Sequence, residues 1–275
     1  MRIFIIGANS KLAKHIYEKL IENNGFHVFK ISRSNIDYVN DIYNLELKIK
    51  KIKPEFIINC AAISSYKGCD EDHIMAFKIN ALLPYKLSKL SNDINSILIH
   101  FSTDAVFSHN IKRLKTVHDE LLPETKLGIS KMLGEKLLSN YNNNVIIRLP
   151  ILYGKHFKDS FFGKAINSLK NNKNIVVAND VYCSPTSSKD VSQFVYNLIL
   201  ELIKNKTIKK KIIHLSSNVL ISRYDFLYHY AKKIKKINYL NFNKFKDIKA
   251  RTKPLKYMGI KANVRKFKID YNDIS

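Results

Sequence analysis

The sequence has no tryptophan, little cysteine and no long apolar run. Its three cysteines, Cys60, Cys69 and Cys183, are scattered and form no C-x-x-C pair. This argues against a disulfide framework or a zinc site and fits a reducing cytoplasm. No apolar run reaches the roughly 18 residues of a transmembrane helix, and the N-terminus lacks the cleavage site of a signal peptide. We therefore expect a cytoplasmic protein with no membrane span and no metal site.

Glycine and acidic residues are also scarce. Glycine accounts for only 8 of 275 residues, against a usual level of about 7%. Lys and Arg total 47 against 23 acids, which gives a net charge of +24. Such a charge is typical of proteins that bind nucleic acid or anionic membranes, but Lys, Ile and Asn are abundant throughout, so we favour compositional drift. Because no nucleic-acid recognition motif is present, we expect only weak, salt-sensitive nucleic-acid binding.

Apolar runs alternate with helical patterns over the first 150 residues. Buried strands are predicted at 1–6, 27–31, 56–58, 97–101 and 145–147, and helices at 12–21, 43–52, 75–91 and 128–141. Strands that alternate with helices of 10 to 15 residues predict right-handed crossovers and a doubly wound parallel sheet of the α/β class. We expect a first domain over 1–150 and a smaller lobe over 151–275, part of which returns to the sheet.

The first predicted strand ends in a candidate dinucleotide turn. Residues 7–13 fit G-x-x-G-x-x-G, with Ser10 and Ala13 in place of the second and third glycines. Small residues there let the backbone approach a pyrophosphate, and the N-terminus of the following helix attracts phosphate. With one glycine of three, an ordinary strand-to-helix turn is the alternative interpretation. The expected cofactor contacts from this turn are Gly7, Asn9, Ser10, Lys11 and Leu12.

The end of the second strand indicates which dinucleotide is preferred. An NAD site places an acidic residue there to bind the ribose hydroxyls, but this chain has Ser32 and Arg33 and no acid until Asp37. The guanidinium of Arg33 suits a 2′-phosphate. We therefore expect NADP(H) to be favoured over NAD(H), with a plain surface arginine as the alternative.

Five further segments carry a family resemblance. Residues 59–62 read N-C-A-A, 102–107 read S-T-D-A-V-F, and 128–135 read G-I-S-K-M-L-G-E, followed by R-L-P-I-L-Y-G at 148–154 and D-V-Y-C-S-P-T at 180–186. In order and spacing they resemble the dTDP-4-dehydrorhamnose reductase family of extended short-chain dehydrogenases/reductases, over residues 1 to about 190. The resemblance implies a Rossmann-like fold, a substrate-binding C-terminal lobe and a homodimer as one expected assembly.

The resemblance also implies an activity and a set of site residues. Relatives use NAD(P)H to reduce the C4 keto group of dTDP-4-dehydro-L-rhamnose, a nucleotide sugar used for surface polysaccharide. Thr103 matches the catalytic hydroxyl, and Lys131 matches the lysine that contacts the nicotinamide ribose. Ala61 and Ala62 match cofactor-binding positions. The positions expected to contact substrate are Ser102, Thr103, Asp104, Arg148, Tyr153, Tyr182 and Pro185.

One catalytic residue of the family is missing. Relatives read P-x-x-x-Y-G-x-S-K, whereas residues 123–131 read P-E-T-K-L-G-I-S-K, so Leu127 stands where the proton-donating tyrosine belongs. A positioned general acid contributes about 10²–10⁴ in rate. One interpretation is a reductase that is slow or uses another proton donor. The candidates for that donor are Tyr66, Tyr153, Tyr182, His118 and a water bound to Lys131.

The other interpretation is a regulatory or scaffold subunit that keeps nucleotide binding, as the regulatory beta subunit of methionine adenosyltransferase does within this family. The retained turn, Thr103 and Lys131 favour the reductase modestly.

Overall fold

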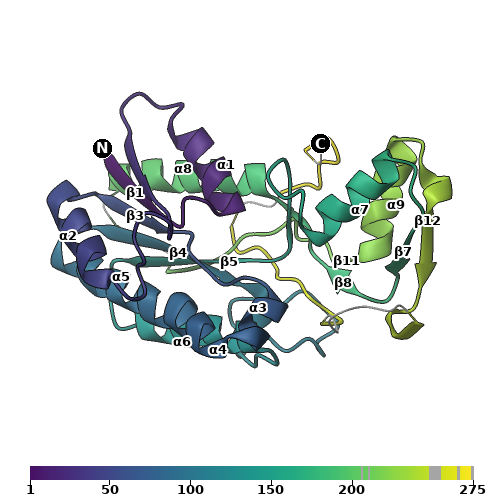
Figure 1. Ribbon diagram of the computed structural model, residues 1–275, viewed down its shortest axis with the longest axis horizontal. Helices are drawn as coiled ribbons and strands as arrows, with labels where there is room; N and C mark the ends of the chain where they lie inside the picture. The colour runs from purple at the N-terminus through teal and green to yellow at the C-terminus, as the bar shows by residue number, and fades with distance from the viewer. Residues whose placement is uncertain (206, 210, 248–254, 265–266, 274–275) are drawn as a thin grey trace.

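The computed structural model describes residues 1–205, 207–209, 211–247, 255–264 and 267–273. Its larger part is a six-stranded sheet in the order β10-β5-β4-β3-β1-β2, in which every adjacent pair is parallel (Figure 1). The strands are β1 (Arg2–Ile6), β2 (His27–Ile31), β3 (Phe56–Asn59), β4 (Ile97–Thr103), β5 (Asn144–Leu149) and β10 (Ile212–His214). The predicted doubly wound parallel sheet is confirmed.

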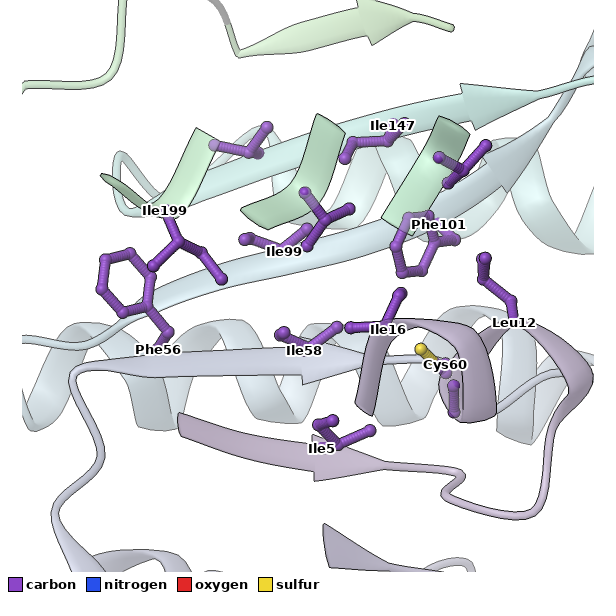
Figure 2. Packing of buried hydrophobic residues seen from close by; sticks show 14 of the residues in the cluster. Ile5, Leu12, Ile16, Phe56, Ile58, Cys60, Ile99, Phe101, Ile147 and Ile199 are labelled. Atoms are coloured by element: carbon purple, nitrogen blue, oxygen red, sulfur yellow. The ribbon is translucent and has the colours of Figure 1, made fainter. Parts of the chain in front are cut away.

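Helices cover both faces of the sheet. Successive strand residues point to opposite faces, so each strand contributes apolar side chains to two cores. Ile3 and Ile5 pack under α1 (Lys11–Leu20) and α8 (Ser188–Asn205), as Figure 2 shows for part of this core. Phe4 and Ile6 belong to a second core on the other face. The helices over that face are α2 (Ile42–Ile52), α5 (Leu83–Asp93) and α6 (Lys126–Leu138).

The segment predicted as a single helix over 75–91 is divided into three. It consists of α4 (His73–Phe77), the π-helix η1 (Lys78–Leu82) and α5, which has Pro84 in its first turn. Proline lacks an N–H and is tolerated only where no helical hydrogen bond is required. A π-helical turn is often found at functional sites, and this one carries the buried Asn80.

A smaller lobe lies beside the carboxyl ends of the strands (Figure 1). Phe162 and Phe226 pack against each other within its core, between α7 (Phe161–Lys170) and α9 (Arg223–Lys233). Short strand pairs complete it: β6 (Leu152–Tyr153) with β9 (Thr186–Ser187), β7 (Ile175–Ala178) with β12 (Leu240–Asn243), and β8 (Tyr182–Cys183) with β11 (Ile221–Ser222). Within the described ranges, no helix has the length and apolarity needed to cross a bilayer.

Candidate active site

The order of the strands reverses between β1 and β3, which is where ligands bind in open α/β sheets. Gly7 follows β1 with φ +78°, and a Cβ on it would lie 2.5 Å from the backbone nitrogen of Ala61, just after β3. The Ala61 N–H is held by Oδ1 of Asn59 at 3.1 Å. Both the backbone conformation and the close approach therefore require glycine at position 7.

The N-terminus of α1 lies directly after this turn. Ser10 caps the helix, its Oγ accepting the Ala13 N–H at 3.2 Å, and the first turn of the helix has no acidic residue. The Lys11 ammonium lies 4.0 Å from Asp159, and Asn9 is exposed. The side chain of Leu12 packs in the core, so its backbone alone faces the turn. A capped helix start with a positive dipole end fits the pyrophosphate of a dinucleotide.

The end of β2 presents a cation and no available carboxylate. Arg33 is exposed, and Ser32 is buried with its Oγ 2.7 Å from Oδ1 of Asn35. The Asp37 carboxylate accepts the Val39 N–H at 3.1 Å and the Asn40 side-chain amide at 2.8 Å. These hydrogen bonds lower the pKa of Asp37. The nearest acid is thus engaged within its own loop.

Lys131 lies on the buried face of α6, close to the turn after β1. Its Nζ donates to the carbonyl oxygen of Phe101 on β4 at 2.8 Å. Burial lowers the pKa of Lys131 to about 8, with Glu135, Cys69 and Cys60 acting in the opposite direction. The Cys60 thiol interacts with Ser10 as well as Lys131, so the nucleotide turn and the lysine meet around this cysteine.

Thr103 and its neighbours lie at the carboxyl end of β4, where the short helix η2 (Asp104–Val106) begins. The Thr103 hydroxyl accepts the Ala105 N–H and donates to Oδ1 of Asp104, each at 3.2 Å. Within the described part of the chain, Ser102 Oγ and Asp104 Oδ2 are buried without a hydrogen-bond partner. Buried polar atoms without partners are uncommon, and a catalytic role or a bound water or ion is one explanation for them.

Close packing of α6 brings these groups together. A Cβ on Gly128 would lie 2.1 Å from the carbonyl oxygen of Ala105, the residue that follows the Thr103–Asp104 pair. Thr125 caps the helix, its Oγ1 accepting the Gly128 N–H at 3.1 Å. The glycine therefore allows the start of α6 to lie against η2.

Leu127 fills the position of the missing tyrosine with apolar packing. It is 6% exposed and lies in a small cluster with Cys69 and Ala76, against which Tyr66 packs at the start of α3 (Tyr66–Glu71). Burial, and then the charge of nearby Asp104, raise the pKa of Tyr66. Tyr66 is thus the alternative donor that the structure places beside Leu127.

Arg148 lies in a buried ion pair, and this placement does not favour the expected substrate contact. Its Nη2 is 2.6 Å from Oε2 of Glu135, and its Nε donates to both carboxylate oxygens of the same residue. The remaining Nη1 lies 3.1 Å from Nε2 of His214, and the side chain is 3% exposed. The arginine ties β5 to α6, a role that a local motif does not reveal.

The tyrosines predicted to contact substrate differ in placement. Tyr153 is 1% exposed, and its hydroxyl accepts the Asp270 N–H at 3.1 Å within the lobe core, which favours packing over a substrate contact. Tyr182 is half-buried and stacks on Tyr257 with ring centroids 5.2 Å apart. Pro185, another expected substrate contact, is buried. The candidate proton donor His118 is exposed on a loop, and this exposure does not favour a role in the site.

Two residues with a place in this site were not predicted from the sequence. Asn80, fully buried in η1, accepts the Ile63 N–H at 3.0 Å and donates to the Ile63 carbonyl at 2.9 Å and to Ser130 Oγ at 3.0 Å. A polar residue within an apolar helical stretch was its only signal. Arg223 begins α9 with a buried Nε that has no hydrogen-bond partner among the described residues, and it interacts electrostatically with Tyr66.

The fold and this site define a Rossmann-type protein of the short-chain dehydrogenase/reductase class. More narrowly, the chain belongs to the RmlD substrate binding domain family, whose sequence profile matches residues 1–257.

Individual proteins are similar at moderate identity. A dTDP-4-dehydrorhamnose reductase of Aggregatibacter actinomycetemcomitans is 28% identical over 231 residues, which cover 82% of this chain and 76% of that protein. The crystal structure of a dTDP-4-dehydrorhamnose reductase from Clostridium acetobutylicum superposes with a TM-score of 0.84 at 26% identity, covering 95% of this chain and 90% of the other. The crystal structure of the Bacillus anthracis dTDP-4-dehydrorhamnose reductase in complex with NADP superposes with a TM-score of 0.85 at 24% identity, again covering 95% of this chain and 90% of the other.

Proposed function

We propose that this protein is an NAD(P)H-dependent reductase of a 4-keto nucleotide sugar, similar to dTDP-4-dehydrorhamnose reductase, in the synthesis of polysaccharide precursors. The observation that carries the proposal is the position of Thr103 and Lys131 at the carboxyl ends of the strands, beside the capped helix that follows Gly7. Residues 1–150 are assigned to cofactor binding and 151–275 to substrate binding.

The residues fit a nicotinamide dinucleotide. Gly7, Ser10 and the amides at the start of α1 bind the pyrophosphate, with Ala61 lining the opposite side of the turn and the exposed Ala62 next to it in sequence. When bound, the reduced nicotinamide supplies a hydride. Lys131 holds the nicotinamide ribose, and its buried charge stabilises a developing alkoxide, because charges interact more strongly where water is excluded.

The substrate is held by groups around the end of β4. The Thr103 hydroxyl donates to the keto oxygen, and the unpartnered Ser102 Oγ lies next to it in sequence. Tyr182, which is half-buried, contacts the nucleotide sugar from the lobe, and Arg223 supplies a cation from α9.

The competing function is a nucleotide-binding subunit without reductase activity, favoured by the leucine at position 127. Mixing the protein with NADPH and a dTDP-4-keto-6-deoxy sugar, while following NADPH absorbance, separates the two. A reductase consumes NADPH only when the sugar is present. Binding of NADPH by calorimetry without any sugar-dependent consumption would favour the subunit.

Cofactor preference provides a further test. Wild-type protein should bind NADPH more tightly than NADH, and Arg33→Ala should weaken NADPH binding about tenfold or more. A hydrogen bond to a charged group contributes about 1.5–3 kcal/mol, and 1.4 kcal/mol is tenfold in affinity. NADH binding should be unchanged, because NADH has no 2′-phosphate. Calorimetry with both cofactors measures the difference.

A matched control is Lys30→Ala. It removes one positive charge three residues before Arg33, within β2, but the Lys30 ammonium lies 3.9 Å from the ring centroid of Tyr17, on the α1 face. An equal loss in both variants, or no loss in Arg33→Ala, would show that Arg33 is only surface charge.

A further inference from the structure

Reduction of a ketone needs a proton as well as a hydride, and Leu127 has none to give. This inference rests on the proposed function and concerns where that proton comes from. The keto oxygen is expected at the Thr103 hydroxyl, so the nearest acidic group to that hydroxyl is the first to consider. That group is the carboxyl of Asp104, whose Oδ1 is 3.2 Å from Thr103 Oγ1.

The surroundings of Asp104 favour its neutral form. The residue is 5% exposed, and its Oδ2 is buried with no hydrogen-bond partner in the described chain. Removing a carboxylate from water without partners is far more unfavourable than removing a neutral acid. The nearest cation, Lys115, directs its ammonium to the carbonyl oxygen of Tyr257 instead.

The other groups around Asp104 are two neutral side chains and a cation that acts on them. Tyr66 lies on α3 and Cys183 on β8, and the pKa of each is raised first by burial and also by the charge that Asp104 carries when ionised. The Arg223 guanidinium lowers the pKa of these two side chains, whereas Lys115 is the cation that acts on Asp104 itself. Burial raises the pKa of Asp104 to about 7, against the opposing effects of Lys115 and the Thr103 hydrogen bond. A general acid is most effective when its pKa is near the working pH.

We propose that Asp104 supplies the proton for reduction, through the Thr103 hydroxyl. As the carbonyl carbon gains a hydride and its π bond breaks, the oxygen takes the proton of Thr103. Thr103 Oγ1, whose own proton has turned from Asp104 Oδ1 to the keto oxygen, then takes the proton of the neutral Asp104 across the same 3.2 Å contact, so that the sugar leaves as an alcohol and Asp104 is left as a carboxylate. The carboxylate regains a proton from solvent before the next turnover.

The rival donors are less well placed for this step. Tyr66 packs against Leu127, and its raised pKa means that it holds its proton more tightly than Asp104 does. The Lys131 ammonium already donates to the Phe101 carbonyl and is needed as a charge.

Single-turnover reduction by Asp104→Asn with NADPH is the first test, because asparagine keeps the shape of the side chain and removes the acid. We expect the rate to fall roughly 10², in line with the contribution of a general acid. The wild-type rate should fall about tenfold per pH unit above about 7, where the carboxyl ionises. In Asp104→Asn this decline should vanish, leaving only that of Lys131 near its pKa of about 8.

Restoring the family's own donor separates proton supply from substrate binding. Leu127→Tyr added to Asp104→Asn should recover the rate, whereas Leu127→Phe added to it should not. Failure of the tyrosine to rescue, or an unchanged pH decline in Asp104→Asn, would show that Asp104 only binds substrate. A larger fall in the single-turnover rate in Tyr66→Phe than in Asp104→Asn would show that Tyr66, and not Asp104, is the proton donor.

Infrared difference spectroscopy supplies a readout that needs neither cofactor nor activity. Below pH 7, free wild-type protein should show a carbonyl stretch of a protonated carboxyl that Asp104→Asn lacks, and its absence would overturn the assignment. If the band is present but wild type reduces no 4-keto nucleotide sugar, the proposed function itself fails and the role of Asp104 as proton source fails with it.

Discussion

Replacing Glu135 by alanine is expected to lower the free energy of unfolding by about 3–5 kcal/mol, because removing one partner of a buried ion pair leaves the other charge unpaired. Glu135 and Arg148 are joined by three hydrogen bonds, and their side chains are 4% and 3% exposed. Denaturant unfolding monitored by circular dichroism measures the change. Glu135 also raises the pKa of Lys131, so its loss should lower that pKa further.

The chain offers a matched surface pair as control. Glu71 lies 3.3 Å from Lys67 in α3 with both side chains more than half exposed, and Glu71→Ala should change stability by about 0–1 kcal/mol. The double variant Glu135→Met, Arg148→Met should recover most of the loss, since apolar residues of similar volume replace buried ion pairs well. If Glu135→Ala lowers the free energy of unfolding no more than Glu71→Ala does, the buried ion pair does not stabilise the fold as expected.

Leu127→Tyr is expected to raise the rate of 4-keto nucleotide-sugar reduction by roughly 10², because a phenol at 127 would donate directly to the keto oxygen, whereas Asp104 donates only through Thr103, and a directly positioned general acid contributes up to about 10⁴ in rate. Residues 127 and 131 are four apart on α6, so a phenol at 127 lies on the same helix face as Lys131. The buried ammonium of Lys131 favours the ionised phenol and so lowers its pKa. Single turnovers with NADPH, followed by absorbance, prevent product release from masking the chemical step.

Leu127→Phe is the control, because it adds the same ring without the hydroxyl. Leu127→Phe should not raise the rate of reduction. Any fall in that rate measures how poorly the cluster with Cys69 and Ala76 accepts a larger side chain. A fast wild type with no gain from tyrosine would show that another donor is sufficient. No turnover in any variant, despite NADPH binding, would favour the regulatory subunit.

The sheet could be predicted from the sequence because each of its central strands contains a run of at least three apolar residues. β1 and β3 are buried on both faces, so their periodicity needs no tertiary information. The break at η1 could not be predicted in this way. It depends on Asn80 reaching Ile63, which is 17 residues away in the sequence, and on Ser130 in another helix.

The site residues that lie within local sequence motifs could be predicted from the sequence, and the others could not. Gly7 follows β1, Thr103 ends β4 and Lys131 lies within α6, and the structure brings all three to one end of the sheet. The motif that contains Arg148 is the same whether the side chain faces substrate or Glu135. The burial of Arg148 in an ion pair could therefore not be predicted without the three-dimensional structure. Arg223 lies in the lobe, where no motif marks it, and its position depends on how the lobe packs.

The most direct test of the central claim follows the hydride itself. Wild-type protein is incubated with a dTDP-4-keto-6-deoxy sugar and NADPH that carries deuterium in the transferable C4 position, and the sugar product is examined by mass spectrometry and NMR. The account predicts an alcohol with deuterium bonded to C4 of the sugar, formed slowly by wild type and faster by Leu127→Tyr. Deuterium that stays on the nicotinamide in both proteins, while NADPH and sugar are bound, would contradict it.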